Sequence, residues 1–349
     1  MIIQAEDEKY NFTSGHILLF KNNNNFTTIV ISIILGLLIL ATIIGNIFVI
    51  SAVLIDKNLR TVRNYLVLSL AIADLMVACL VMPLSAVNEV NQEWTLGPAL
   101  CDIWTFCDVL CCTASILHLL SIAVDRYWSV TNMDYARQRN ACQIYLMILF
   151  VWITAIVISV APVFGWKDPD FKKRLEEDKK CLVSQDLAYQ IFATFSSFFV
   201  PLIIILILYW RIYQVARNRI RRNPRNKAMF LIKLQSNKQI TECEINNKFG
   251  KLLILAKREN KKCKETSDFK REKKAAKTLA IITGVFVICW FPFFVMALVM
   301  PICRSCQPND YIFSFLLWLG YANSMLNPII YTIFSPDFRQ AFKRLFRLT

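Results

Sequence analysis

Residues 28–55 read TIVISIILGLLILATIIGNIFVISAVLI, and nothing charged occurs between Lys21 and Asp56. A helix rises 1.5 Å per residue, so about 20 apolar residues cross a bilayer. The stretch is therefore long enough to span a membrane as one helix. Lipid leaves no water for unpaired backbone groups, which restricts spanning structures to helices and closed barrels. The alternation typical of barrel strands is absent, so a helix is favoured.

Six further stretches of spanning length follow. Two contain a single carboxylate: Asp74 between Arg63 and Glu89, and Asp108 between Asp102 and Asp125. Four contain no charge: Arg139 to Lys167, Asp186 to Arg211, Lys277 to Arg304, and Asp310 to Asp337. The sequence therefore predicts an all-α membrane protein, a bundle of seven transmembrane helices. A composition of 56% hydrophobic and 19% charged residues agrees, and excludes an ordinary cytosolic enzyme, a fibrous protein and a disordered tail.

Lys and Arg gather on alternate connections between the spans. Residues 211–277 carry 21 Lys and Arg against 6 Asp and Glu, whereas residues 88–102 carry no Lys or Arg. Basic loops stay in the cytoplasm, which places the amino terminus outside and the carboxyl terminus inside. The net charge of +15 is then a topology signal, and no nucleic-acid partner is expected. We expect a multi-pass protein of the plasma membrane.

The same topology divides the chain into three regions. Residues 1–27 form an extracellular tail, in which Asn11 and Asn25 each begin an Asn-X-Thr glycosylation sequon. Residues 28–334 form the seven-helix domain, with a long basic cytoplasmic loop at about 215–272. Residues 335–349 place Phe and Lys or Arg at helical spacing, which favours a short amphipathic helix lying on membrane lipid, followed by a short tail.

Four cysteines fall in segments expected to lie outside. An oxidising compartment makes a bridge between Cys101 and Cys181 plausible. Cys303 and Cys306 lie in the last outer loop, where they could form a local disulfide or half of a zinc site.

A carboxylate at the centre of a membrane helix costs about 2.5 to 3.5 kcal/mol, so Asp74 needs partners. Polar residues in other spans can supply them. The cluster is either an interhelical hydrogen-bond network or a cation site, for which Na⁺ is the expected ion. Its expected members are Asp74, Ser115, Asn323, Ser324 and Asn327.

Asp108 lies about two turns inside the outer end of its span, and no Lys or Arg in any outer half-span can pair with it. A cationic ligand is the simplest partner, and a water-solvated carboxylate is the alternative. Cys112 and Ser115 share its helix face. Aromatic residues of the last two spans would give a bound ammonium cation–π contacts: Trp290, Phe293, Phe294, Trp318 and Tyr321.

Asp125-Arg126-Tyr127 closes the third span at its inner end. Glu272 is a candidate partner for Arg126, although an ordinary interfacial ion pair would give the same pattern. Prolines that would kink spans four to seven are Pro162, Pro201, Pro292 and Pro328.

An ordered set of motifs resembles the class A, rhodopsin-like G-protein-coupled receptors over residues 28–348. The motifs are Gly45-Asn46, Leu70-Ala71-Ile72-Ala73-Asp74, Cys101, Asp125-Arg126-Tyr127, Trp152, Pro201, Cys289-Trp290-Phe291-Pro292 and Asn327-Pro328-Ile329-Ile330-Tyr331. Asp108, seven residues after Cys101, resembles the biogenic-amine branch. Within that branch, residues 102–132, 181–217 and 311–344 are similar to type-1-like serotonin receptors, especially those of invertebrates.

The resemblance implies a receptor without enzymatic chemistry and without a cofactor, apart from a possible allosteric Na⁺. Asp108 would pair with the ammonium of an amine ligand, and Thr194 and Ser197 would meet polar groups of its aromatic head. Val109 and Leu182 would complete the ligand contacts. Further implied partners are a heterotrimeric G-protein, arrestin and receptor kinases.

Activation would rearrange Arg126, Tyr209 and Tyr331 as the sixth span swings outward. The long basic inner loop and short tail of type-1-like receptors favour Gi/o proteins and lowered cyclic AMP, with Gs as the alternative. A channel or transporter is not favoured, because no internal repeats or paired broken spans occur.

The ligand expected from the fifth span is serotonin. Ala193 stands where catecholamine receptors of this family present a hydroxyl, so only Thr194 and Ser197 can reach a ligand. That suits an indole with one ring hydroxyl and one ring N–H. Tyramine, octopamine and dopamine remain the alternatives.

Overall fold

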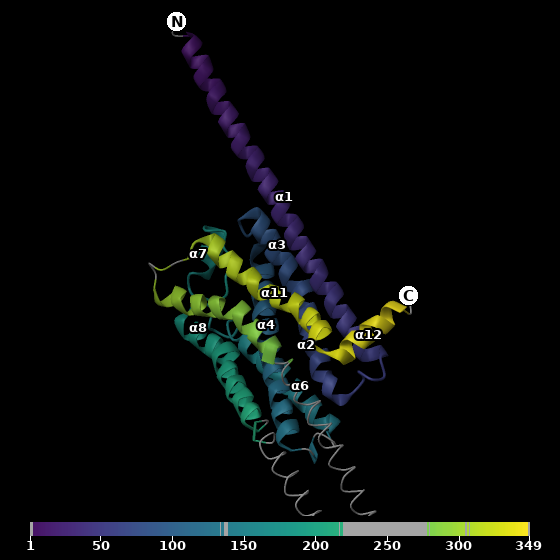
Figure 1. Ribbon diagram of the computed structural model, residues 1–349. Coiled ribbons are helices and arrows are strands. Elements are labelled where there is room, and N and C mark those ends of the chain that lie inside the picture. The colour runs from purple at the N-terminus through teal and green to yellow at the C-terminus, as the bar shows by residue number, and fades with distance from the viewer. Residues whose placement is uncertain are drawn as a thin grey trace, which may run out of the picture.

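The structure is a computed structural model that describes residues 3–132, 134–135, 139–215, 217–218, 278, 280–303, 306 and 308–347. Every regular element within these residues is a helix, as predicted, and the helices pack into one bundle (Figure 1). The expected basic loop at 215–272, including Glu272, lies almost wholly outside the described part of the chain. So do the side chains of Asn11 and Asn25.

Six helices of the described chain are long and apolar enough to cross a membrane. They are Phe26–Ile55, Val62–Asn91, Gly97–Thr131, Ala141–Val160, Leu187–Val215 and Ala280–Ile302. The seventh predicted span is α11 (Asp310–Phe334), which is less apolar because it carries Asn323, Ser324 and Asn327. The seven-helix prediction is therefore confirmed at the level of helix number and placement.

The first helix is longer than the sequence suggested. α1 (Ile3–Ile55) continues through the boundary expected at residue 28, and its first part projects beyond the bundle (Figure 1). The second span is built from η1 (Val62–Asn64), α2 (Tyr65–Met76), η2 (Val77–Val81) and α3 (Met82–Asn91). The third and fourth spans are α4 (Gly97–Thr131) and α6 (Ala141–Val160). The fifth begins with α8 (Leu187–Thr194) and η3 (Phe195–Phe199).

Two of these spans contain a π-helical turn, η2 and η3, just before a proline. Pro83 and Pro201 cannot donate a backbone hydrogen bond, and their rings crowd the carbonyl four residues earlier. A wider turn relieves that crowding, because it moves the hydrogen-bond register by one residue. Pro162 was expected to kink the fourth span, but it lies in the turn after α6, which ends at Val160.

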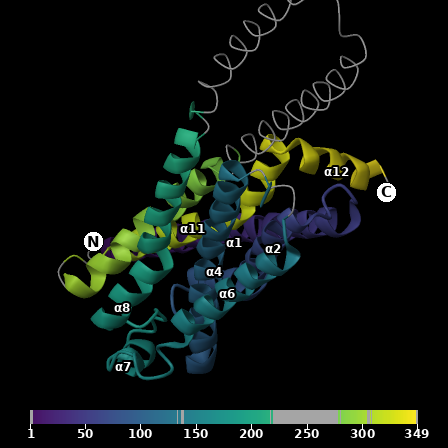
Figure 2. The same ribbon diagram turned by 90° about the horizontal axis from the view of Figure 1, so that it is seen from below.

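α4 lies in the middle of the bundle (Figure 2) and is buried along most of its length. A hydrogen-bond chain joins it to two neighbours. Trp152 of α6 donates to the Ser69 hydroxyl of α2 at 3.1 Å, and Ser69 lies 2.7 Å from Nε2 of His118. Nδ1 of His118 lies 2.7 Å from the Ala114 carbonyl, which can only accept, so Nδ1 carries the proton. The fully buried His118 thus links α4 to Ser69 of α2, which Trp152 joins to α6.

The chain ends in the predicted amphipathic helix, α12 (Pro336–Arg347). Phe338 and Phe342 are buried, while Lys343 is exposed. Phe338 stacks on Tyr331 of α11 with ring centroids 5.3 Å apart. Arg344 pairs with Asp56, the residue that follows α1, at 2.8 Å. α12 is therefore held against the bundle at the end where α1 stops.

Candidate functional site

A cavity of about 700 Å³, including its open mouth, lies at the end of the bundle that carries the Cys101–Cys181 disulfide. We refer to this as the disulfide end. The walls come from α4, α8, η3, the Ala280–Ile302 helix, α11 and the 161–186 loop between α6 and α8. The lining residues are Asp108, Val109, Cys112, Thr113, Leu182, Val183, Gln185, Tyr189, Gln190, Ala193, Thr194, Ser197, Trp290, Phe293, Phe294, Ala297, Met300 and Phe313.

Asp108 is the only charged residue among the described residues that line the cavity. It is 6% exposed, and the Cys112 thiol donates to its Oδ1 at 3.7 Å. The Tyr321 hydroxyl lies beside the same carboxylate. A buried carboxylate that lacks a cationic protein partner in its cavity favours a cationic ligand.

A relay of hydrogen bonds orients Tyr321. The Trp104 indole N–H donates to Ser85 at 3.0 Å, and the Ser85 hydroxyl donates to the Tyr321 oxygen at 3.3 Å. Because the Tyr321 oxygen already accepts a hydrogen bond, its own proton is free to point at Asp108. Trp318 packs edge-on against Tyr321 at 5.5 Å. Neither Trp318 nor Tyr321, both predicted to touch the ligand, is among the described residues that line the cavity, although Tyr321 contacts Asp108, which is.

Aromatic rings of the sixth span form part of the cavity wall. Trp290 meets Phe293 edge-on at 5.6 Å, and Phe294 stacks on Phe198 of η3 at 4.4 Å. Gly320 of α11 makes room for Trp290, since a Cβ at residue 320 would come within 2.6 Å of the indole ring. Three of the predicted aromatic partners of an ammonium, Trp290, Phe293 and Phe294, are therefore held by packing and share the cavity with Asp108.

The hydroxyl-bearing wall comes from the fifth span. Ala193, Thr194 and Ser197 all line the cavity, and both hydroxyl side chains are nearly buried. Thr194 is the last residue of α8 and Ser197 lies within η3. The sequence placed these hydroxyls on one α-helical face. The structure keeps both in the cavity, although the turn between them is π-helical.

Several lining residues were not predicted. Ala297 and Met300 continue the helical repeat begun by Trp290 and Phe293, so periodicity could have identified them. Gln190 precedes Ala193, Thr194 and Ser197 at helical spacing and could have been identified in the same way, whereas Gln185 could not, because the 161–186 loop reaches the cavity only through its own folding.

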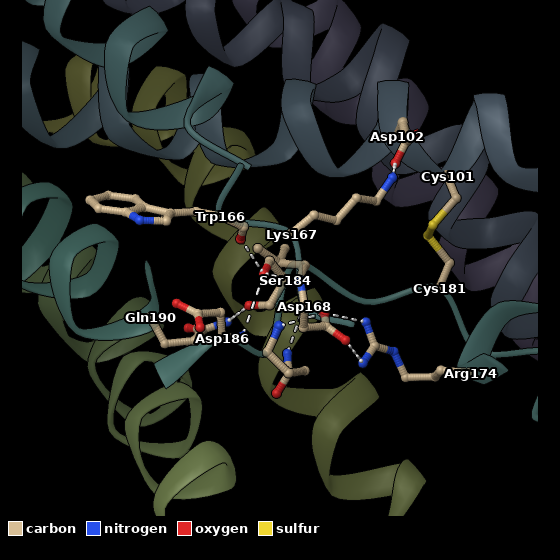
Figure 3. A network of polar contacts seen from close by, with 12 residues as sticks. Cys101, Asp102, Trp166, Lys167, Asp168, Arg174, Cys181, Ser184, Asp186 and Gln190 are labelled. Carbon is tan, nitrogen blue, oxygen red and sulfur yellow. Dashed lines mark hydrogen bonds and ion pairs between the residues drawn. A yellow bond between two sulfur atoms is a disulfide. The ribbon is translucent and has the colours of Figure 1, made fainter. Parts of the chain in front are cut away.

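Both expected pairs of cysteines are bridged. Cys101 of α4 is bonded to Cys181 of the 161–186 loop, with Cα atoms 5.8 Å apart (Figure 3). Cys303 is bonded to Cys306, which removes the thiolates that a zinc site would need.

A second polar cluster surrounds Asp74, which is fully buried in α2. Ser324 and Asn327 of α11 donate to its two oxygens, each at 2.8 Å. Ser115 of α4 contacts the same carboxylate. The side-chain oxygens of Asn323 and Asn327 are buried and have no hydrogen-bond partner. Four of the five predicted residues, Asp74, Ser115, Ser324 and Asn327, therefore come together, and the fifth, Asn323, lies on the same helix as Ser324 and Asn327 with an unused oxygen acceptor.

A third cluster lies at the opposite end of α4. The fully buried Asp125 lies 3.3 Å from Nη2 of Arg126 and 3.0 Å from Nε of Arg139, and it accepts from the Tyr135 hydroxyl at 3.1 Å. Burial and the neighbouring Asp125 charge raise the pKa of Tyr135 to about 12, so this donor keeps its proton at neutral pH. Arg126 is thus paired with its own neighbour.

Three other predicted activation residues lie on α4, the fifth span and α11. Tyr127 packs beside Val130 and Ile212, which joins α4 to the fifth span. The Tyr209 hydroxyl lies 3.1 Å from the Thr283 hydroxyl, which joins the fifth span to the sixth. Tyr331 is buried on α11.

The amino-acid sequence is similar to that of known receptors. Residues 45–331 match the 7 transmembrane receptor (rhodopsin family). The chain is 50% identical to a 5-hydroxytryptamine receptor of Heliothis virescens, over 86% of this chain and 80% of that receptor. It is 49% identical to one of Bombyx mori, over 90% and 83%. It is 41% identical to human 5-hydroxytryptamine receptor 1D, over 90% and 88%. The family match includes the cavity and the Asp74 and Asp125 clusters.

Proposed function

Because this chain belongs to the rhodopsin family of seven-transmembrane receptors, we propose that its ligand is serotonin (5-hydroxytryptamine) and that it activates a Gi/o protein. As a member of that family it is a receptor, not an enzyme, and a multi-pass protein of the plasma membrane. The disulfide end faces outside and α12 lies inside. The distribution of Lys and Arg in the sequence supports this orientation.

The proposal rests on one cavity, which is lined by a lone buried carboxylate, by aromatic rings and by two hydroxyl groups. Asp108 pairs with the primary ammonium, which also gains cation–π contacts with the rings of the sixth span. Thr194 and Ser197 then meet the ring hydroxyl and the indole N–H. The relatives in Heliothis virescens and Bombyx mori are named 5-hydroxytryptamine receptors, which supports the same ligand.

Serotonin is favoured over a catecholamine by what the fifth span lacks. Two adjacent ring hydroxyls need matched partners, and an unmatched buried polar group costs about 1 to 3 kcal/mol. Ala193 lines the cavity without a hydroxyl. Tyramine and octopamine have one ring hydroxyl and are better matched than dopamine, but an indole offers more area to Phe293 and Phe294.

We expect serotonin to be the most potent agonist, with dopamine and tyramine at least about tenfold weaker, which corresponds to roughly 1.4 kcal/mol. The measurement is a dose–response series for each amine on cells that express the full chain. Ala193→Ser should narrow the gap for dopamine, because it adds the missing hydroxyl. If tyramine or dopamine is more potent than serotonin, the ligand assignment is wrong and the amine-receptor assignment stands.

Signalling follows from a shift of population between conformations. An agonist favours the state to which it binds more tightly, and a G-protein does the same from the inner side. In this structure Asp125 forms ion pairs with Arg126 and Arg139. The contact between Tyr209 and Thr283 links the fifth and sixth spans. In the active state Trp290 transmits ligand contact to the kink at Pro292, the sixth span moves outward, and Arg126 and Tyr331 rearrange. Arrestin, receptor kinases and membrane lipid are the remaining partners that we propose.

Coupling to Gi/o predicts that serotonin lowers forskolin-stimulated cyclic AMP and that pertussis toxin abolishes this response. The support is the identity with receptor 1D and the basic composition of residues 211–277. Cyclic AMP is measured with and without toxin in the same cells. A toxin-insensitive rise in cyclic AMP would instead identify Gs as the partner.

The Asp74 cluster fits an allosteric Na⁺. A bound cation would use the carboxylate together with the unpaired oxygens of Asn323 and Asn327. Such an ion stabilises one arrangement of α2, α4 and α11, so it opposes any agonist that favours another arrangement.

Replacing KCl by NaCl at equal ionic strength should therefore weaken agonist binding severalfold, and Asp74→Asn should remove this difference. Binding is measured by displacement of a labelled antagonist in both salts. Equal Na⁺ sensitivity in the parent chain and in Asp74→Asn would place the ion elsewhere.

A further inference from the structure

The 161–186 loop is a folded unit with a buried ion pair at its centre. Asp168 and Arg174 form two parallel hydrogen bonds, Nη1 to Oδ1 at 3.1 Å and Nη2 to Oδ2 at 3.0 Å (Figure 3). Their side chains are only 7% and 14% exposed. Bidentate pairs of this kind fix geometry as well as charge.

The short helix α7 (Phe171–Glu176) holds Arg174 in place. Phe171 and Leu175 are buried in the same apolar cluster as Trp104 and the Cys101–Cys181 bridge. The Arg174 carbonyl accepts from the Lys180 backbone at 3.1 Å. α7 is therefore packed into the apolar core and hydrogen-bonded to the residue that precedes Cys181.

Asp168 also holds residues 181–186, the strip of this loop that lines the cavity. Its Oδ2 accepts from the Gln185 backbone N–H at 2.9 Å, and its own N–H donates to the Ser184 hydroxyl at 3.1 Å. Ser184 in turn donates to the Trp166 carbonyl at 2.6 Å. Leu182, Val183 and Gln185 line the cavity from this strip, whereas Asp168 and Arg174 are not among its described lining residues.

The strip is also connected to the fifth span. Gln190 of α8 donates to the Ser184 carbonyl at 2.7 Å, and Asp186 caps α8 through the Tyr189 N–H at 2.8 Å (Figure 3). Residues 181–186 are therefore held at one end by the disulfide, in the middle by Asp168, and at the other end by α8. Thr194 follows Gln190 by one turn on that helix.

We infer that this network makes the 161–186 loop a pre-formed lid over the cavity, and that Asp168 and Arg174 are positioning residues that set how fast an amine enters and leaves. The inference rests on the proposed function for its ligand. A strip that is pinned at three points opens rarely, which slows passage in both directions. Losing the pair loosens the strip without removing any ligand contact.

The kinetic test compares Asp168→Asn and Arg174→Gln with the parent chain in cell membranes, using labelled serotonin. Both variants should release ligand at least about fivefold faster, with association also faster, so that affinity changes less than either rate. The double variant should resemble each single variant, since the two residues act as one unit.

Matched controls separate the buried pair from net charge. Lys172→Gln removes one positive charge from the same helix and Asp178→Asn one negative charge from the same loop, and both residues are exposed. Neither control should change the rates by more than about twofold, since exposed pairs contribute little. If the pair variants show fewer binding sites but the rates of the parent chain, they only lose folded receptor, and the inference is overturned. It is also overturned if Lys172→Gln or Asp178→Asn changes the rates as much as the pair variants do.

A second measurement needs no ligand. Hydrogen exchange on the purified full chain should show slow exchange at the Gln185 amide, which becomes fast in Arg174→Gln and stays slow in Lys172→Gln. Fast exchange in the parent chain would show that no pre-formed lid exists. If no amine binds the parent chain while the amide is protected, the proposed function fails and the lid remains.

Discussion

Replacing Asp108 by Asn is expected to lower serotonin affinity by roughly two to four orders of magnitude, because removing one partner of a buried ion pair costs about 3 to 5 kcal/mol. Asn keeps the shape of the side chain and can still accept from Cys112, so the cavity should stay intact. Affinity is measured by competition against a labelled ligand, with surface expression counted in parallel.

The matched control for this variant is Asp310→Asn. Asp310 lies at the disulfide end on α11, pairs with Lys180 at 2.8 Å, and has a side chain that is 74% exposed. The substitution Asp310→Asn removes the same charge from the same end of the molecule and leaves the cavity lining unchanged. Serotonin affinity should change by less than about 1 kcal/mol. Normal amine binding by Asp108→Asn would show that the ammonium binds elsewhere.

Replacing Cys101 or Cys181 by Ser should reduce surface expression and ligand binding severely, and the double variant should be no worse than either single variant. The bridge closes a loop of 80 residues, which corresponds to about 4.5 kcal/mol of chain entropy. It also anchors one end of the strip that lines the cavity. Expression is counted at the cell surface, and binding is measured on the same cells.

Cys303→Ser provides the comparison, because its bridge spans a sequence separation of only 3 residues and corresponds to about 2 kcal/mol at most. Its effect should be the milder one. Additive losses for Cys101→Ser and Cys181→Ser would show that the two residues act independently.

The transmembrane spans and the role of Asp108 could be predicted from the sequence, because both depend on the residues of a single segment. A charge-free run of about 20 residues crosses lipid as a helix whatever its neighbours are. A lone Asp108 in such a run needs a partner for the same reason. The amphipathic α12 follows from its repeat of Phe and basic residues, and its buried Phe338 and Phe342 agree.

The shape of the site was less predictable, because it depends on contacts between distant segments. Ser85 reaches Tyr321 across 236 residues of sequence, and this bond helps to orient the Tyr321 hydroxyl beside Asp108. His118 lies in an apolar stretch of sequence, and only its partners on α2 and α6 show its role.

The sequence by itself determined the seven helices and the carboxylate that lines the cavity. These features depend on the free energy of transferring each segment from water to lipid. That free energy is set by the residues of the segment itself. Only the tertiary structure decided which surfaces line the cavity and how the 161–186 loop covers it. That loop carries equal numbers of acidic and basic residues over 167–186, so its composition does not single out Asp168 and Arg174. The pair is selected by burial, because the low dielectric of a packed loop strengthens the one ion pair whose geometry is bidentate.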